Sequence, residues 1–144
     1  MAITQSVCNS FKSEVLKGLH NFSASGGDVF KIALYTSNAS LNSATTVYTT
    51  TGEVSDSGTN YTAGGKVLTN IEPSMSSDVG FTDFENVSWA SASFTARGAL
   101  IYNSTNGNRA VVVLDFGLDR VVSAATFTVT FPNADPQNAI VRFK

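Results

Sequence analysis

Between residues 66 and 143 the sequence is a succession of short segments with strand character, separated at small intervals by turn-forming residues. Seven segments show apolar residues in alternation or in short runs: 66–71, 79–84, 87–89, 94–102, 110–116, 126–131 and 139–143. An eighth, 29–36, precedes them with Phe30, Ile32 and Leu34 at period two. This pattern is typical of sandwich folds. The sequence therefore predicts a mainly β fold, an antiparallel β-sandwich of jelly-roll or immunoglobulin-like type.

Three of these segments carry more specific signals. Asn106 and Gly107, in the turn between 94–102 and 110–116, can adopt the positive φ angles of a tight reversal, which predicts a hairpin. The continuous apolar run 110–116 predicts a central strand covered on both faces. In 126–131 phenylalanine and valine alternate with threonine, so one face is expected to be buried and the other lined by hydroxyl groups.

The N-terminal region has the only helical pattern. Val7, Phe11, Val15 and Leu19 recur every four residues, which predicts a short amphipathic α-helix within residues 4–20. Its apolar stripe is expected to pack on the domain's own sheet or on a neighbouring subunit. Gly26 and Gly27 follow as a joint, so we divide the chain into an N-terminal helical arm, 1–22, and a β-sandwich domain, 23–144. Deleting the arm is expected to leave the domain folded and to weaken assembly.

Residues 37–65 form a long polar passage with one candidate strand at 47–51. It is too long for a connecting turn, which predicts a functional loop or a weakly paired edge hairpin that a partner orders. Tyr48 and Tyr61 are its candidates for an exposed contact surface. The residues predicted to contact partners are therefore Phe11, Val15, Leu19, Tyr48 and Tyr61. The phenylalanines of the strand segments are expected in the core, namely Phe30, Phe81, Phe84, Phe94, Phe116, Phe127, Phe131 and Phe143.

Composition narrows the class of function. Only 14% of residues are charged and the net charge is −2, whereas Ser, Thr and Asn number 46 of 144. A basic nucleic-acid-binding face is not expected. No basic segment followed by an apolar run opens the sequence, and no apolar stretch approaches a membrane span, so we expect synthesis in a cytoplasm and no membrane partner. Cys8 is the single cysteine, which excludes an intramolecular disulfide.

The residues available for chemistry are few. His20 is the only histidine and is expected to face solvent at the helix end, and Cys8 is expected to be buried. One histidine and one cysteine cannot complete a zinc site. The Gly64-Gly65 pair lacks the setting of a nucleotide site and is interpreted as a turn or flexible joint. The acidic residues Glu53, Asp56, Asp83, Glu85, Asp115 and Asp119 are interpreted as solvated loop acids. We predict no enzymatic activity, no cofactor and no metal.

Several stretches carry a resemblance that spans nearly the whole chain. They are Phe11-Lys12, 16–18, 30–37, 53–55, 61–65, 95–103, 110–117 and 138–142, of which 95–103 is the most distinctive. In these stretches the sequence resembles small structural proteins encoded by tailed bacteriophages. The resemblance implies a protein of the virus particle, made in the host cytoplasm, and it brings no catalytic residues.

Two functions are compatible with this resemblance. The first is a capsid cement or decoration protein, a homo-oligomer that binds and stabilises the shell of the major capsid protein. The second is a tail, neck or head-fibre component that recognises a host surface glycan with Tyr48, Tyr61 and neighbouring asparagines.

Overall fold

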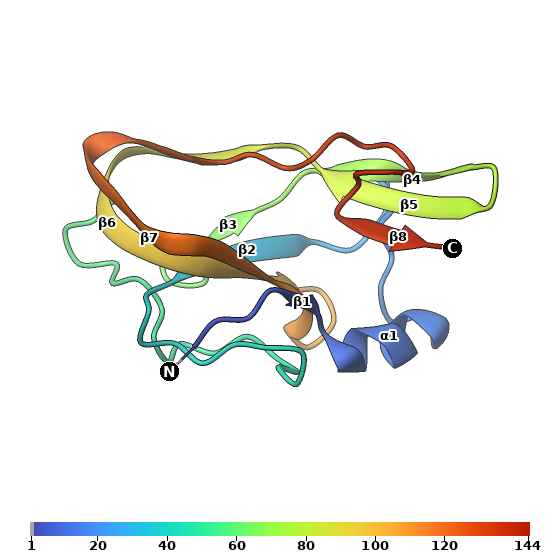
Figure 1. The fold of residues 1–144 in the computed structure, drawn as a ribbon, viewed down its shortest axis with the longest axis horizontal. Coiled ribbons are helices and arrows are strands. Elements are labelled where there is room, and N and C mark those ends of the chain that lie inside the picture. The colour runs from blue at the N-terminus through green and yellow to red at the C-terminus, as the bar shows by residue number, and fades with distance from the viewer. Residues whose placement is uncertain (1) are drawn as a thin grey trace.

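The computed structural model describes residues 2–144 and shows two antiparallel β-sheets with one short α-helix (Figure 1). The elements are β1 (Ser6–Val7), α1 (Asn9–Leu16), β2 (Phe30–Tyr35), β3 (Lys66–Val67), β4 (Asn70–Ser76), β5 (Val79–Phe84), β6 (Val87–Asn103), β7 (Arg109–Val129) and β8 (Val141–Phe143). The larger sheet has the order β1-β7-β6-β2-β3 and the smaller one β4-β5-β8. The predicted mainly β, antiparallel class is confirmed and is consistent with a sandwich. The finer jelly-roll or immunoglobulin-like assignment stays a prediction.

The long hairpin of β6 and β7 dominates the fold. The strands contain 17 and 21 residues, and Asn103 pairs with Arg109 across the predicted turn. The hairpin is confirmed, but the positive φ angles belong to Gly107 and Asn108, 67° and 57°, and not to the predicted pair Asn106 and Gly107. The sequence pattern divided each strand into two segments, but 87–89 with 94–102, and 110–116 with 126–131, are continuous strands. Of the run 110–116, which was predicted to be a central strand covered on both faces, residues 110–114 are buried, whereas Asp115 and Phe116 are partly exposed.

The hairpin bends where β7 has more residues than β6 between two consecutive pairs of the ladder. Ala96 pairs with Arg120 and Gly98 with Asp115, so one residue of β6 lies opposite 116–119 of β7. Extra residues of this kind bend a strand. A Cβ atom at Gly98 would lie 2.5 Å from the Leu114 carbonyl oxygen, so glycine is required at this close approach. Figure 1 shows the bend at the end of the molecule opposite α1 and β8, with the hairpin folding back as a second layer.

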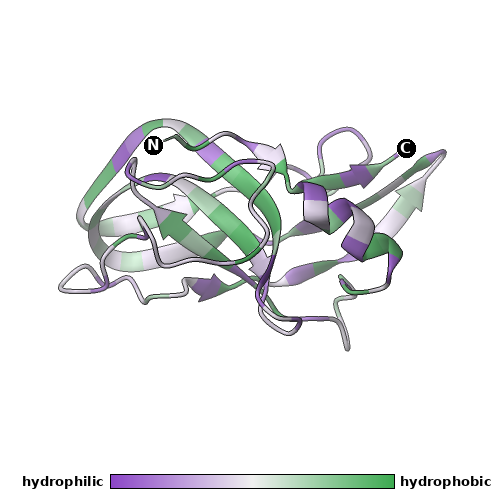
Figure 2. Cartoon of the chain, turned by 90° about the horizontal axis from the view of Figure 1, so that it is seen from below, coloured by the Kyte–Doolittle hydropathy of each residue, from purple (hydrophilic) through white to green (hydrophobic). Residues whose placement is uncertain are grey.

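Hydrophobic residues concentrate in the central strands, whereas the surrounding loops are pale or hydrophilic (Figure 2). The aliphatic residues of β2, β6 and β7 form the middle of the core. Two groups of aromatic rings flank them. Near α1 lie Phe11, His20, Phe22, Phe30, Phe84 and Phe131, and near the bend lie Tyr61, Trp89, Phe94, Phe116 and Phe127.

The N-terminal segment is part of this core and not a detachable arm. β1 pairs with β7 at Val112 and Val113, and α1 begins only after it, so the helix is shorter than the predicted 4–20. Cys8, Phe11 and Phe22 are buried with the residues of the β-sheets. The expected alternative, packing on the domain's own sheet, is the one observed. Residues 2–22 and the rest of the chain therefore share one core.

Residues 36–65 are ordered by contacts within the chain. Val54 donates its backbone N–H to Leu34 and Tyr48 donates its N–H to Asn108, at 3.0 and 2.9 Å. The candidate strand 47–51 is reduced to a single bridge between Val47 and Arg109. Leu41, Val54 and Tyr61 are buried, so apolar side chains of this polar passage pack into the core of the chain itself.

Candidate functional site

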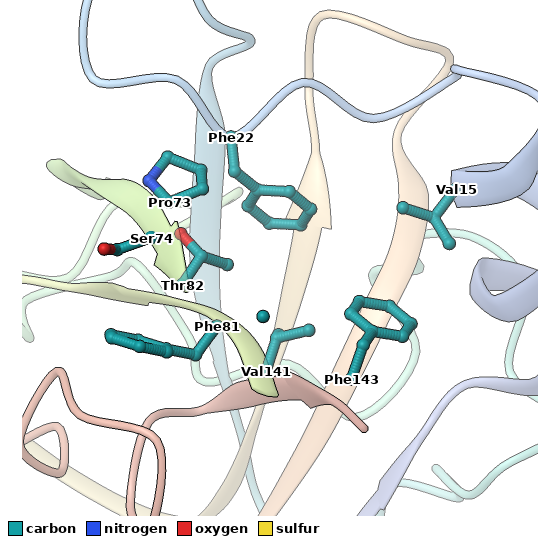
Figure 3. A pocket seen from close by; sticks show the side chains of 9 residues that line it. Val15, Phe22, Pro73, Ser74, Phe81, Thr82, Val141 and Phe143 are labelled. Atoms are coloured by element: carbon teal, nitrogen blue, oxygen red, sulfur yellow. The ribbon is translucent and has the colours of Figure 1, made fainter. Parts of the chain in front are cut away.

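An apolar groove separates α1 from the three-stranded sheet and has a volume of about 210 Å3. Its lining includes Val15, Phe22, Phe81, Thr82, Val141 and Phe143. Figure 3 shows Val15 and Phe143 facing the same hollow as Phe22. Phe143 is 49% exposed and Phe81 is partly exposed. The prediction that these two phenylalanines lie in the core is therefore wrong. They lie on β5 and β8, two strands of the small sheet.

The position of β8 explains why the groove is open. β8 is an edge strand that pairs only with β5, and Val141 and Phe143, two residues apart, fall on the same face. The volume is small compared with typical ligand pockets of about 300–1,000 Å3. An apolar cavity of about 150 Å3 accommodates a benzene-sized group. The groove is therefore suited to one or two apolar side chains of a protein partner.

A second surface is formed by the last third of β7 and by Thr130, the residue that follows the strand. Thr126, Thr128 and Thr130, here called the threonine face, are exposed, whereas Val129 is buried and Phe127 is half-buried, which confirms the predicted alternation. Ser88 of β6 extends this face through a 2.9 Å hydrogen bond between its hydroxyl and that of Thr128. No charged residue occurs from 121 to 131.

The outer edge of β7 beside this face is free. Its N-terminal part pairs with β1 at two positions, and residues 114–129 have no ladder partner other than β6 within the part of the chain that the structure describes. An unpaired strand edge offers a row of backbone donors and acceptors to another chain. The surface is thus rich in hydroxyl groups and able to form many hydrogen bonds, and Arg120 lines a hollow together with Thr128 and Thr130.

The tyrosines of the polar passage do not form an exposed platform. The hydroxyls of Tyr48 and Tyr61 donate to the Glu53 carboxylate at 2.7 and 2.5 Å, and the Gly64 N–H donates to it at 2.8 Å. Tyr61 is 2% exposed, and Tyr48, half-buried, stacks on Tyr102. The prediction of an exposed contact surface is therefore wrong for Tyr61 and leaves little of Tyr48 available. The cause is Glu53, whose carboxylate draws both hydroxyls inward.

These tyrosines are held in their neutral form. Burial raises the pKa of Tyr102 to about 12, with a smaller contribution from the charge of Glu53. Burial, followed by the hydrogen bond to Glu53, raises the pKa values of Tyr48 and Tyr61 further. The neutral hydroxyls hold residues 47–64 on the sheet, since Tyr61 accepts from the Leu34 N–H at 2.9 Å and Tyr102 donates to the Gly64 carbonyl at 2.6 Å.

His20 is buried, which corrects the expectation of a solvent-facing side chain. Asn103 Nδ2 lies 3.1 Å from His20 Nδ1 and donates to it, so the proton on Nε2 is directed to Glu14 Oε1 at 3.0 Å. Arg109 donates to the other Glu14 oxygen at 3.0 Å, and Asn103 also donates to Asp28 at 2.8 Å. This network joins α1 to the hairpin turn and occupies every polar atom of the imidazole.

The remaining predicted residues are dispersed. Phe11 is buried, Val15 lines the groove and Leu19 is half-buried. Asp56 and Glu85 are exposed acids, as predicted, whereas Asp83 is buried. Asp115 and Asp119 lie 3.4 and 4.0 Å from Arg97. Within residues 2–144 no three His, Cys, Asp or Glu side chains gather as a metal site would require, and no helix has the length and apolarity to cross a membrane.

Comparison with known proteins finds no matching family model, no similar curated protein and no similar solved structure.

Proposed function

We propose that this chain is a non-enzymatic structural protein of a virus particle, a cement or decoration protein bound to the outer surface of the major capsid protein shell. The observation that supports this proposal most is the threonine face with its free β7 edge. The three threonines are exposed, no charged residue occurs from 121 to 131, and residues 114–129 have no ladder partner other than β6 in the part of the chain that the structure describes. The resemblance of the sequence to bacteriophage structural proteins points to the same role.

The chemistry of this surface is suited to binding a subunit of a capsid shell. Neutral hydroxyls form hydrogen bonds without the large desolvation cost of burying charges. The free edge of β7 can accept an extended segment of a shell subunit as an additional strand. A standard interface buries about 800 Å2 on each partner. When linked copies of the protein bind at many positions of the shell lattice, their overall avidity is much higher than the affinity of one contact. Moderate affinity at each position is therefore sufficient for stable binding.

The internal contacts of the reactive side chains support a non-catalytic role. Glu53 is bound by two tyrosine hydroxyls and a backbone N–H, and both nitrogens of His20 are occupied by Glu14 and Asn103. In these positions the groups stabilise the fold instead of presenting a base or nucleophile to a substrate.

The alternative function is that of a tail, neck or head-fibre protein that binds glycan. The tyrosines proposed for its glycan site are not available for contact. Tyr61 is buried, and the hydroxyl of Tyr48 donates to Glu53. A glycan site would have to use other side chains.

The proposal is tested by co-sedimentation of the purified protein with shells assembled from the major capsid protein of the same particle. Wild-type protein is expected to sediment with the shells. Thr126→Glu combined with Thr130→Glu places two charges on the threonine face and is expected to weaken binding at least about tenfold.

Thr62→Glu is the matched control, because Thr62 is exposed and lies outside this face. If Thr62→Glu weakens binding to the shells as much as the double variant does, the threonine face is not the binding surface. Failure of wild-type protein to sediment with shells would contradict the function itself.

A further inference from the structure

A hollow of about 360 Å3 lies where the bent strand β7 approaches itself (Figure 1). Phe116 and Arg120 line it from one part of the strand, and residues 127–130 line it from the last part. The rings of Phe116 and Phe127 are 6.1 Å apart, whereas eleven residues of straight strand span about 36 Å. The bend therefore forms this hollow, here called the β7 hollow. Its volume is within the range of typical ligand pockets, about 300–1,000 Å3.

The β7 hollow lies at the unpaired edge of the strand. Successive side chains point to opposite faces of a strand, so Phe127 and Val129 belong to one face, and Thr128 and Thr130 to the other. All four residues line the same hollow, and none of its lining residues belongs to β6. The hollow is therefore beside the strand, on the side away from β6. On that side, within residues 2–144, positions 114–129 have no ladder partner, so backbone N–H and C=O groups are available at its margin.

Arg120 is the one charged residue among those that line the β7 hollow. It is exposed, and its guanidinium donates one long hydrogen bond, 3.4 Å, to the Phe116 carbonyl. In the part of the chain that the structure describes, no carboxylate oxygen lies within 4.0 Å of it, because Asp115 and Asp119 lie against Arg97 instead. A guanidinium has five N–H donors in a fork that matches a carboxylate. The β7 hollow thus offers a positive charge that has no acid of its own.

Apolar surface lies beside this charge. Phe116 and Phe127 are both partly exposed and line the same hollow as Arg120. An extended segment that adds to the β7 edge presents every second side chain to the same face, about 6.6 Å apart. An acidic side chain can then meet the guanidinium while a residue two positions away covers the phenylalanine rings. Backbone pairing along the edge favours a peptide over other anions.

We propose that the β7 hollow binds an extended acidic segment of a partner protein. An aspartate or glutamate of this segment pairs with Arg120, and an apolar residue two positions away packs on Phe116 and Phe127. The identity of the partner as a subunit of the shell rests on the proposed function. The inference deepens that function, because it requires the shell segment that adds to β7 to be acidic.

The binding chemistry is tested without shells, by NMR titration of the isotope-labelled protein with two synthetic peptides. The first is acetyl-Thr-Val-Thr-Val-Thr-Glu-Thr-Val-Thr-amide, and the second has Gln in place of Glu. The Glu peptide is expected to shift the amide signals of residues 116–130 and to bind about five- to tenfold more tightly, since hydrogen bonds to charged groups are the stronger ones.

Arg120→Gln is expected to abolish this preference. Arg142→Gln is the matched control, because Arg142 is also exposed, also lies beyond 4.0 Å from every described carboxylate oxygen, and does not line the β7 hollow. The amide spectrum of each variant verifies that it is folded. In co-sedimentation with shells, Arg120→Gln is expected to bind about five- to tenfold more weakly than wild type, and Arg142→Gln equally well.

Four outcomes would overturn the proposal. The first is equal affinity for the two peptides, and the second is a preference that survives Arg120→Gln. The third is binding of sialyllactose at residues 116–130 without binding of either peptide, which indicates an acidic glycan. The fourth is a shift of the same amide signals on dilution of the protein alone, which indicates a second copy of the chain.

Failure of this inference is distinguishable from failure of the proposed function. Wild-type protein that prefers the Glu peptide but does not sediment with shells supports the acidic-segment site and contradicts the shell role. Shells that bind wild type and Arg120→Gln equally well support the shell role and contradict the use of the β7 hollow.

Discussion

At the scale of single residues, Cys8 reports whether the N-terminal segment is part of the core. Its side chain is fully buried, and burial, with the charge of Glu14 as a smaller cause, raises the pKa of the thiol to about 11. Because the thiolate is the reactive form, native protein is expected to resist iodoacetamide at pH 8, whereas denatured protein reacts at once. Mass spectrometry measures the extent of alkylation. Rapid alkylation of the native protein would show that β1 and α1 detach.

Asp83 provides a second residue-level prediction. Burial raises the pKa of this carboxyl, an effect that the backbone N–H groups of Phe84 and Ile140 oppose. Since the folded pKa lies above the unfolded value of about 3.9, the folded state binds the proton more tightly. The free energy of unfolding therefore falls as pH rises from about 4 through the folded pKa.

Asp83→Asn is expected to remove this part of the pH dependence and to be more stable than the wild type at neutral pH. Urea denaturation of both proteins between pH 4 and 8 measures the difference, with exposed Asp78→Asn as the control. A constant difference across this range would contradict the account.

Residue-level predictions from the sequence succeeded where a local pattern decides burial. Cys8 and the alternating threonines of β7 are examples. The environments of Tyr61 and His20 could not be predicted in this way, because each depends on a residue that the fold brings near. Glu53 is eight positions from Tyr61, and Asn103 is 83 positions from His20. The groove likewise depends on strand register, which a single sequence does not reveal.

At the scale of elements, deletion of residues 2–22 is expected to abolish folding, which reverses the prediction made from sequence. The deletion removes β1, α1, Phe11 and Phe22, and truncating each buried phenylalanine costs about 3–5 kcal/mol. A domain of this size is stable by about 5–15 kcal/mol in total. Circular dichroism and solubility of the truncated chain measure the result. A truncated protein that is soluble and melts cooperatively would instead support the prediction that the N-terminal helical arm is separable from the domain.

The docking of residues 36–65 on β2 is tested at Gly65. Its φ angle is +83°, and a Cβ atom would lie 1.8 Å from the Ile32 carbonyl oxygen. Gly58 has a similar φ, +73°, with no atom within 4 Å. Gly58→Ala is therefore expected to cost about 1–2 kcal/mol from backbone strain alone, and Gly65→Ala considerably more. Equal losses in urea denaturation would contradict the close packing of the loop on β2.

The sequence predicted the positions of most strands but not their continuity. The turn at 103–108 is specified by local residues, so the hairpin was predictable. The joining of 87–89 with 94–102 was not, because bulges at positions such as Ser91 and Ala124, both with positive φ, let each strand continue through residues that lack strand pattern. Gly65, interpreted from sequence as a turn or joint, is a packing position against β2.

At the scale of the whole molecule, the proposed shell contact belongs to the threonine face. The high content of Ser, Thr and Asn agrees with this proposal, since only 14% of residues are charged and hydroxyl and amide groups supply most of the polar side chains. Charged substitutions on the threonine face are expected to weaken shell binding and to leave the fold intact.

The most direct test of the central claim is a cryo-electron microscopy reconstruction of particles that contain this protein. The account predicts density for the chain in many copies on the outer surface of the head, with the last third of β7 against the major capsid protein. Density confined to the tail or neck, or a shell contact made by another face, would contradict it.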